Sequence, residues 1–341
     1  MDDIAKLRAR DRADVLAVAA VQLKESLDVS PLILEKDYWV CWTLKRVFGL
    51  QGLPGLLFKG GTSLSKGYGL INRFSEDIDL VLDRKWFGVP DPRDPDLGSN
   101  EIKRRREKLT EVCNAYIRDD LLPTIRQVFR DSLGAKGWSA EIDTQQQDCI
   151  VFSYPPALDR GDYGAQGYIK PAIKLEFGIR GEHNPAEMKN VRPYIASIAL
   201  GNLAIGSTEV NVLHPRRTFW EKALIHHRHV LKPPENYHRH SRHSYDLVRL
   251  AESWVGQEAM ADTALLAEVV DHERTMFLRA GHSIYDAAVP GTFRLVSDDD
   301  AQLERMRMDY RDMEPMFFVD PPPFDQIIAG LRDLQARINA L

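Results

Sequence analysis

The sequence has few cysteines and no long apolar run, and both absences exclude classes of protein. Its 341 residues contain only Cys41, Cys113 and Cys149, without a CxxC pair. An odd, widely spaced set argues against a disulfide framework and against a cysteine-based zinc site. No stretch approaches the roughly 20 apolar residues of a membrane-spanning helix. The first residues carry charges where a signal peptide is apolar, so we expect a cytoplasmic protein with no membrane partner.

The chain also lacks a strong excess of either charge. It has 45 Lys and Arg against 50 Asp and Glu, a net charge of −5, which argues against a surface covered in basic residues. The average hides a local excess, because residues 214–249 hold eight Lys and Arg but three Asp and Glu. That segment is therefore +5 and the remainder −10. The patch is compatible with a phosphate-bearing partner.

Length and periodicity predict two parts. At about 150 residues per domain the chain is long enough for two domains. Alternating and helical patterns are mixed in the first part, whereas the second is mainly helical. We place the first domain at 1–208 and the helical C-terminal domain at 209–341, with helices expected at 217–231, 241–255 and 258–281.

Most of the histidines fall in the basic segment, which raises a zinc hypothesis. Six of the ten lie between His226 and His243, some at ligand-like spacing. No cysteine joins them, and the surrounding Lys and Arg would repel a cation. We favour a contribution to a phosphate-binding surface.

A glycine turn followed by two acidic residues is the most informative stretch. A short apolar strand ends at Gly60 and Gly61, a helix is expected over 62–70, and a strand over 77–82. Residues i and i+2 of a strand point to the same side, so Asp77 and Asp79 can converge on a hard cation such as Mg²⁺. Backbone N–H groups at the helix start can bind a triphosphate. A glycine pair alone is usually an ordinary turn, and two acidic residues alone are usually a solvated strand edge. The combination of the two favours a functional site.

This stretch resembles motif I of the AbiEii/AbiGii-type nucleotidyltransferases, the toxins of type IV toxin–antitoxin and abortive-infection systems. The matching string is KGGTSLSKGYGLINRFSEDIDL at residues 59–80. The resemblance implies a DNA polymerase β-like, α+β fold with a mixed sheet flanked by helices, plus the α-helical C-terminal domain. It implies catalytic, metal-binding roles for Asp77 and Asp79. The nucleotide- or phosphate-binding positions that it implies here are Gly60, Gly61, Thr62, Ser63, Arg73 and Ser75. The stretch 35–39 (EKDYW) also resembles one found in this family, and we interpret it as a helix packed under the sheet.

A third carboxylate is available on another expected strand, 169–178. Glu176 could be a third metal ligand beside Asp77 and Asp79. It shares a strand face with Lys174, so a salt bridge with that lysine is the alternative.

Two further motifs lie in the helical part. Residues 218–222 (TFWEK) resemble a helix start typical of the family, with Thr218 and Glu221 spaced as a capping box. The resemblance makes Lys222 functional, and a lysine there would neutralise the triphosphate and stabilise the leaving pyrophosphate. A surface lysine is the alternative.

The last motif, R-x-x-Y-D-L, begins at Arg242, which we expect to bind phosphate. Asp246 is expected to be catalytic, either accepting a hydrogen bond from nucleotide or acceptor hydroxyls or orienting Lys222. Many relatives carry an acid directly after the arginine, where this chain has His243.

The resemblance implies transfer of a nucleoside monophosphate from an NTP to an RNA acceptor, with the tRNA 3′ end as the leading candidate. It implies Mg²⁺ as cofactor, a cleft between the two parts as active site, toxicity in cells, and a cognate antitoxin acting with or without a stable complex. Two alternatives stay open. One is a metal-dependent nuclease or phosphohydrolase using the same carboxylates, and the other is a nucleotide-binding module without catalysis.

Overall fold

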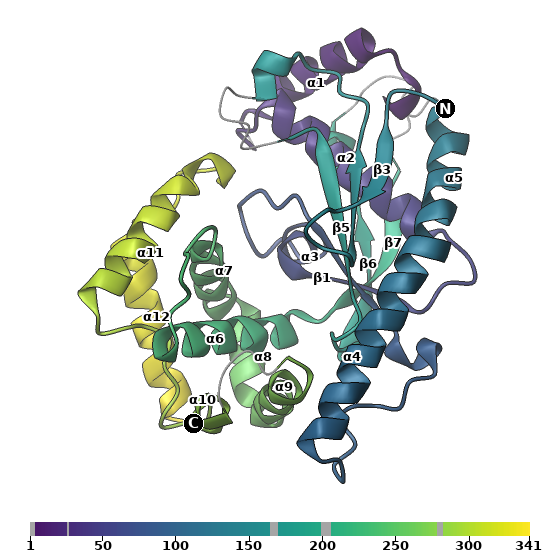
Figure 1. Cartoon of the computed structure of the whole chain (residues 1–341). Helices are drawn as coiled ribbons and strands as arrows, with labels where there is room; N and C mark the ends of the chain where they lie inside the picture. The colour runs from purple at the N-terminus through teal and green to yellow at the C-terminus, as the bar shows by residue number, and fades with distance from the viewer. Residues whose placement is uncertain (1–3, 26, 164–169, 199–205, 278–281) are drawn as a thin grey trace. The chain divides into compact units, whose positions relative to one another are not determined.

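The computed structural model describes residues 4–25, 27–163, 170–198, 206–277 and 282–341 (Figure 1). The predicted element ends at residues 169 and 278–281 lie outside this range. The chain forms two compact units, each assembled from three pieces. Unit 1 comprises Met1–Tyr68, Phe74–Val89 and Glu107–Val212, and unit 2 comprises Gly69–Arg73, Pro90–Arg106 and Leu213–Leu341.

Unit 1 is built on a mixed sheet, which within the described residues has seven strands in the order β3-β4-β5-β2-β1-β7-β6. The central strand β2 is antiparallel to β1 and parallel to β5, whereas β1 is parallel to β7. The strands are β1 Leu56–Lys59, β2 Ile78–Leu82, β3 Ser139–Ile142, β4 Cys149–Ser153, β5 Ala172–Gly178, β6 Ala186–Val191 and β7 Thr208–Leu213.

Helices of unit 1 pack on this sheet through aromatic side chains. Trp39 and Trp42 of α2 contact Phe152 of β4 at ring-centroid distances of 5.9 and 5.7 Å, and Phe129 of α5 meets Phe152 at 4.6 Å. Because α2 and α5 meet the same side chain of β4, they cover the same face of the sheet. The helices of unit 1 are α1 Ala9–Leu23, α2 Pro31–Phe48, α3 Gly60–Lys66 and α5 Leu122–Leu133, and α4 Ser99–Tyr116 is shared with unit 2.

Unit 2 is helical. Its buried apolar residues come from all of its longer helices and from the segment before α11, where Phe293 and Leu295 are fully buried. The helices are α6 Pro215–Leu231, α7 Ser241–Glu252, α8 Trp254–Ala261, α9 Thr263–Met276, α10 His282–Asp286, α11 Asp300–Asp312 and α12 Phe324–Asn339. The predicted fold class, a mixed sheet flanked by helices plus a helical C-terminal part, is confirmed.

Three local predictions were wrong. Asp77 directly precedes β2 instead of lying in it. Thr218 lies inside α6, which begins earlier because His214 caps the N–H of Arg216 and Pro215 occupies the first turn. The helix expected at 258–281 is broken at Asp262, whose side chain caps α9. No helix in the described part of the chain is both long and apolar enough to cross a membrane.

Candidate functional site

Strand pairing in unit 1 brings the predicted carboxylates together. Asp79 on β2 and Glu176 on β5 are Cα partners, and Asp77 comes two residues before Asp79. Burial and the charges of Asp79 and Asp77 raise the pKa of Glu176 to about 7. Burial is the larger cause of this shift, and repulsion of Glu176 by the two aspartates adds to it, as expected for carboxylates close enough to share a cation.

The donor set fits Mg²⁺. This ion takes oxygen ligands and is often held by one or two protein carboxylates, while water and substrate phosphates complete its shell. Among the residues described, no group of three or more His, Cys, Asp or Glu is arranged as a metal site. This finding covers the acidic group and also the described histidines that raised the zinc hypothesis. Asp77 and Asp79 would hold the ion together with substrate. Lys174, the alternative partner of Glu176, pairs with Asp143 at 3.2 Å between Nζ and Oδ2.

The glycine turn lies directly against this acidic group. Gly60 has φ +78°, a conformation that side chains other than glycine rarely adopt. A Cβ built on Gly60 would lie 1.8 Å from Oδ2 of Asp79. Glycine is therefore favoured at this position for two reasons. Its backbone has a positive φ, and the Asp79 carboxylate occupies the space of a Cβ.

Side chains after the turn fix the acidic loop. The Thr62 hydroxyl donates to the Asp77 carbonyl oxygen at 2.5 Å and lies 2.9 Å from Oγ of Ser75. The Ser63 hydroxyl donates to the Gly60 carbonyl oxygen at 2.9 Å, and both Thr62 and Ser63 are buried. These hydroxyls hold the turn and the loop, so what this segment offers a phosphate is backbone N–H groups at the start of α3.

The stretch 35–39 lies on α2 and is buried, as a helix packed under the sheet requires. Two consecutive charges on this helix contact the motif I region. Lys36 pairs with Glu76, directly before Asp77, and Asp37 pairs with Lys66 at the end of α3. Removing one partner of a buried ion pair strongly destabilises a protein. The two pairs therefore fix the end of α3 and the residue before Asp77 to α2.

Unit 2 brings three other predicted residues into one buried network. Asp246 of α7 receives two hydrogen bonds from the Arg73 guanidinium, both at 2.7 Å, and lies 2.8 Å from Nζ of Lys222 on α6. The side chains of Arg73, Asp246 and Lys222 are exposed by only 2%, 0% and 7%. Lys222 is therefore not a surface lysine.

The charges in this network determine its protonation. Burial opposes ionisation of Asp246, but Arg73 and Lys222 outweigh it and hold its pKa at about 2. Burial lowers the pKa of Lys222, and the Asp246 carboxylate offsets part of that shift. Arg242, which we expected at phosphate, adds positive charge near Lys222. Of the two roles open for Asp246, the contacts favour orienting Lys222.

Sequence reasoning missed two residues of this network. His243 lies with Nδ1 3.3 Å from Nζ of Lys222. Asp309 of α11 accepts hydrogen bonds from the backbone and hydroxyl of Ser241, where α7 begins. The three-residue spacing of His243 and Asp246 on one helix was a usable signal for the first. Asp309 had no signal, because its partner is 68 residues away.

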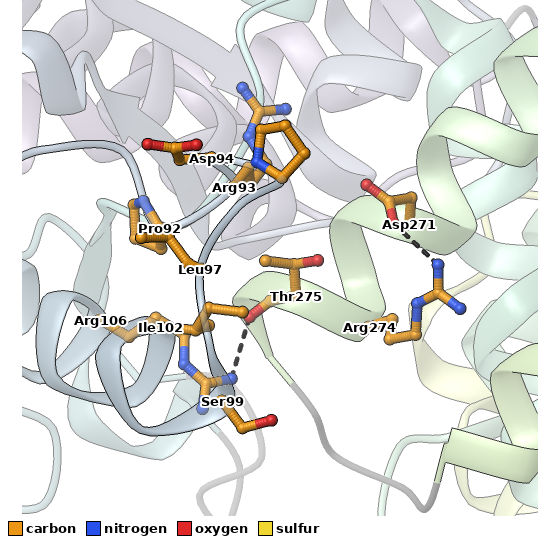
Figure 2. Close-up of a pocket in the computed structure, with 11 residues that line it drawn as sticks. Pro92, Arg93, Asp94, Leu97, Ser99, Ile102, Arg106, Asp271, Arg274 and Thr275 are labelled. Carbon is orange, nitrogen blue, oxygen red and sulfur yellow. Dashed lines mark hydrogen bonds and ion pairs between the residues drawn. The ribbon is translucent and has the colours of Figure 1, made fainter.

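A separate pocket of about 460 Å³ lies in unit 2 and contains none of the predicted site residues (Figure 2). A loop, α4 and α9 line it, and Arg106 donates to the carbonyl oxygen of Thr275 at 3.0 Å. Its other two arginines pair with acidic residues, Arg93 with Asp91 at 3.3 Å and Arg274 with Asp271 at 2.9 Å. The pocket therefore carries little unbalanced charge.

The comparison with known protein families identifies the class of the protein as a nucleotidyltransferase. The sequence model of the "Nucleotidyl transferase AbiEii toxin, Type IV TA system" family matches residues 46–330, so the chain belongs to the AbiEii family of nucleotidyltransferase toxins. Among solved structures, the chain is similar to MenT4, a nucleotidyltransferase toxin from Mycobacterium tuberculosis H37Rv. The TM-score is 0.51 at 16% sequence identity, over 96% of this chain and 90% of that one. A search of curated proteins gives no match.

Proposed function

We propose that this toxin transfers a nucleoside monophosphate from an NTP to the 3′ end of an RNA, with tRNA as the leading acceptor, and so blocks translation and growth. The observation that carries the proposal is the acidic group of Asp77, Asp79 and Glu176 beside a turn at Gly60 that admits no side chain. Phosphoryl chemistry needs oxygen ligands for a cation and backbone space for phosphates, and this group offers both.

In this proposal the acidic group binds Mg²⁺, which when bound neutralises phosphate charge. Asp77 and Asp79 would hold the ion, with Glu176 on the neighbouring strand as the third ligand. Thr62 keeps the Asp77 backbone in place through its hydrogen bond to the carbonyl oxygen. The backbone N–H groups of Gly61 and its neighbours face the triphosphate.

Lys222 supplies positive charge to the triphosphate and to the departing pyrophosphate. Asp246 favours the charged form of its ammonium group and orients it, and Arg73 holds the Asp246 carboxylate in place, at the distances given above. Arg242 adds charge near it. Only Phe74 separates Arg73 from Ser75 in the sequence. One short segment therefore carries both Arg73, a partner of Asp246, and Ser75, which contacts Thr62 beside the acidic group.

Incubation of the purified protein with each labelled NTP, total tRNA and Mg²⁺ tests the proposal. We expect labelled RNA that is longer than the input, and no label with Asp77→Asn or Lys222→Met. Shortened RNA would instead establish a nuclease. Nucleotide binding without any change in RNA would establish a binding module.

The family implies an antitoxin partner. We propose that it is encoded nearby and neutralises the toxin with or without a stable complex. Co-expression that restores growth, followed by co-purification, separates these two modes.

A further inference from the structure

We propose that His243 is a positioning residue, which holds the ammonium group of Lys222 by accepting a hydrogen bond at an unprotonated Nδ1. The proposal rests on the proposed function only for its catalytic consequence. Its structural part concerns two side chains of unit 2, Lys222 on α6 and His243 on α7, whose nitrogen atoms are 3.3 Å apart.

The protonation states follow from the donors available. A lysine ammonium group has three N–H donors and no acceptor. Lys222 lies 2.8 Å from the Asp246 carboxylate, which favours the ammonium form. An ammonium nitrogen within hydrogen-bond range of a ring nitrogen requires a lone pair on that ring nitrogen. His243 is therefore neutral, with its proton on Nε2.

The surroundings of His243 keep it neutral. Lys222 and His226 face it from α6, and Arg242 and His240 face it from the beginning of α7. Burial, followed by the charges of Lys222 and Arg242, holds the pKa of His243 well below its usual range. The ring thus serves as an acceptor throughout the neutral range of pH.

The arrangement gives Lys222 two acceptors on one helix. His243 and Asp246 are three residues apart on α7, so both side chains emerge on the same face. Asp246 supplies charge and His243 supplies only a lone pair. The histidine therefore restricts the direction of the ammonium group without adding a second negative charge that would neutralise it.

Two variants separate the hydrogen bond from the bulk of the side chain. His243→Leu removes the acceptor, whereas His243→Asn keeps an acceptor oxygen close to the Nδ1 position. Since a hydrogen bond to a charged group contributes about 1.5–3 kcal/mol, we expect His243→Leu to lower kcat by roughly 10- to 100-fold with KM for NTP little changed. His243→Asn should recover most of the rate. Gln257→Leu, at an exposed position of α8, is the control and should behave as wild type.

A spectroscopic readout tests the same contact without relying on activity. In ¹⁵N-histidine-labelled wild-type protein near neutral pH, the His243 ring, assigned with the Asn variant, should show unprotonated Nδ1 and protonated Nε2. A protonated Nδ1, or a His243→Leu enzyme with wild-type kcat and KM, would overturn the proposal. If the wild type transfers no nucleotide, the proposed function fails and the ring signals alone decide the role of His243. If the Leu variant does not fold, the Asn variant and the ring signals decide.

Discussion

At the scale of single residues, the network of Arg73, Asp246 and Lys222 explains why charged side chains can be buried here. One carboxylate serves two cations, and every contact is a charge-assisted hydrogen bond or ion pair. Arg73, expected at phosphate, has its guanidinium on Asp246, so its contribution is to hold that carboxylate. The loss of stability on substituting one residue of the network depends on which charged side chains then lack an opposite charge.

Substitution within this network should therefore be asymmetric. Asp246→Ala removes the carboxylate that two buried cations share, and we expect it to lower the free energy of unfolding by about 3–5 kcal/mol. Lys222→Met keeps the Arg73 pair and should cost less than about 2 kcal/mol, while nucleotide transfer falls about 100-fold or more. Urea unfolding and initial rates measure both effects. Equal destabilisation by the two substitutions would contradict the network.

Gly60 offers a second test at this scale. In Gly60→Ala the new Cβ would overlap Asp79 Oδ2, so the carboxylate must move. A displacement of about 1 Å at a reacting centre can reduce rates roughly 100-fold, and we expect a loss of that size. Gly69→Ala is the control, since Gly69 also has positive φ (+64°) but no atom within 4 Å of its Cβ position. It should lose about 1–2 kcal/mol of stability and keep its activity.

Glu176 predicts a pH dependence. Its pKa is raised to about 7 in the folded protein, so folding takes up a proton between the unfolded value of 4.5 and 7. Stability contributed by the neutral form is therefore complete below the lower value and is lost as pH rises towards the upper, by on the order of 3 kcal/mol. Glu176→Gln should remove this slope in urea titrations without divalent ions. In the wild type, Mg²⁺ should restore stability above about pH 7, and its failure to do so would argue against a metal at this group.

At the scale of elements, the part of the chain after residue 300 contacts the two segments that carry Asp246 and Arg73. Asp309 of α11 accepts hydrogen bonds at the start of α7, which carries Asp246, and Phe318 donates its N–H to the carbonyl oxygen of Asn72, next to Arg73. No motif identified this segment, yet it positions two members of the network.

Asp309→Ala should therefore reduce both stability and activity. It removes an acceptor for backbone N–H groups of Arg239 and Ser241, which costs about 1–3 kcal/mol, and it frees the start of α7. Asp262→Ala is the matched control, because Asp262 caps α9 by accepting from Leu265. It should cost about 1 kcal/mol and leave transfer unchanged. Thermal melts and transfer rates compare them, and equal rates for the two variants would show that α7 does not depend on its cap.

How well the sequence predicted an element depended on how local its signal was. The stretch 35–39, which we interpreted as part of a helix, lies on α2, which begins at Pro31 and is capped by the Ser30 side chain accepting from the N–H of Ile33. By contrast β6, Ala186–Val191, was not predicted, because it is a largely polar edge strand with weak alternation. The pairing of Asp79 with Glu176 could not be derived either. Register between strands almost a hundred residues apart depends on the whole sheet.

At the scale of the whole molecule, the local charge excess has an explanation. The segment 214–249 that is +5 forms α6, α7 and the loop between them, and it carries Lys222, His243 and Arg242. The acidic group lies in unit 1, with Asp77 directly before β2, Asp79 on β2 and Glu176 on β5. Motif I supplied the family and the carboxylates from sequence alone. The partners that orient Lys222 came from three separate pieces of chain and needed the structure.

The central claim is nucleotide addition to RNA, and sequencing of RNA 3′ ends after induced expression tests it most directly. Cells expressing the wild type should stop growing and contain tRNAs with extra, untemplated 3′ nucleotides. Cells expressing Asp77→Asn or Lys222→Met at equal level should grow and show unmodified ends. Growth arrest by the wild type with unchanged or shortened RNA 3′ ends would contradict the account.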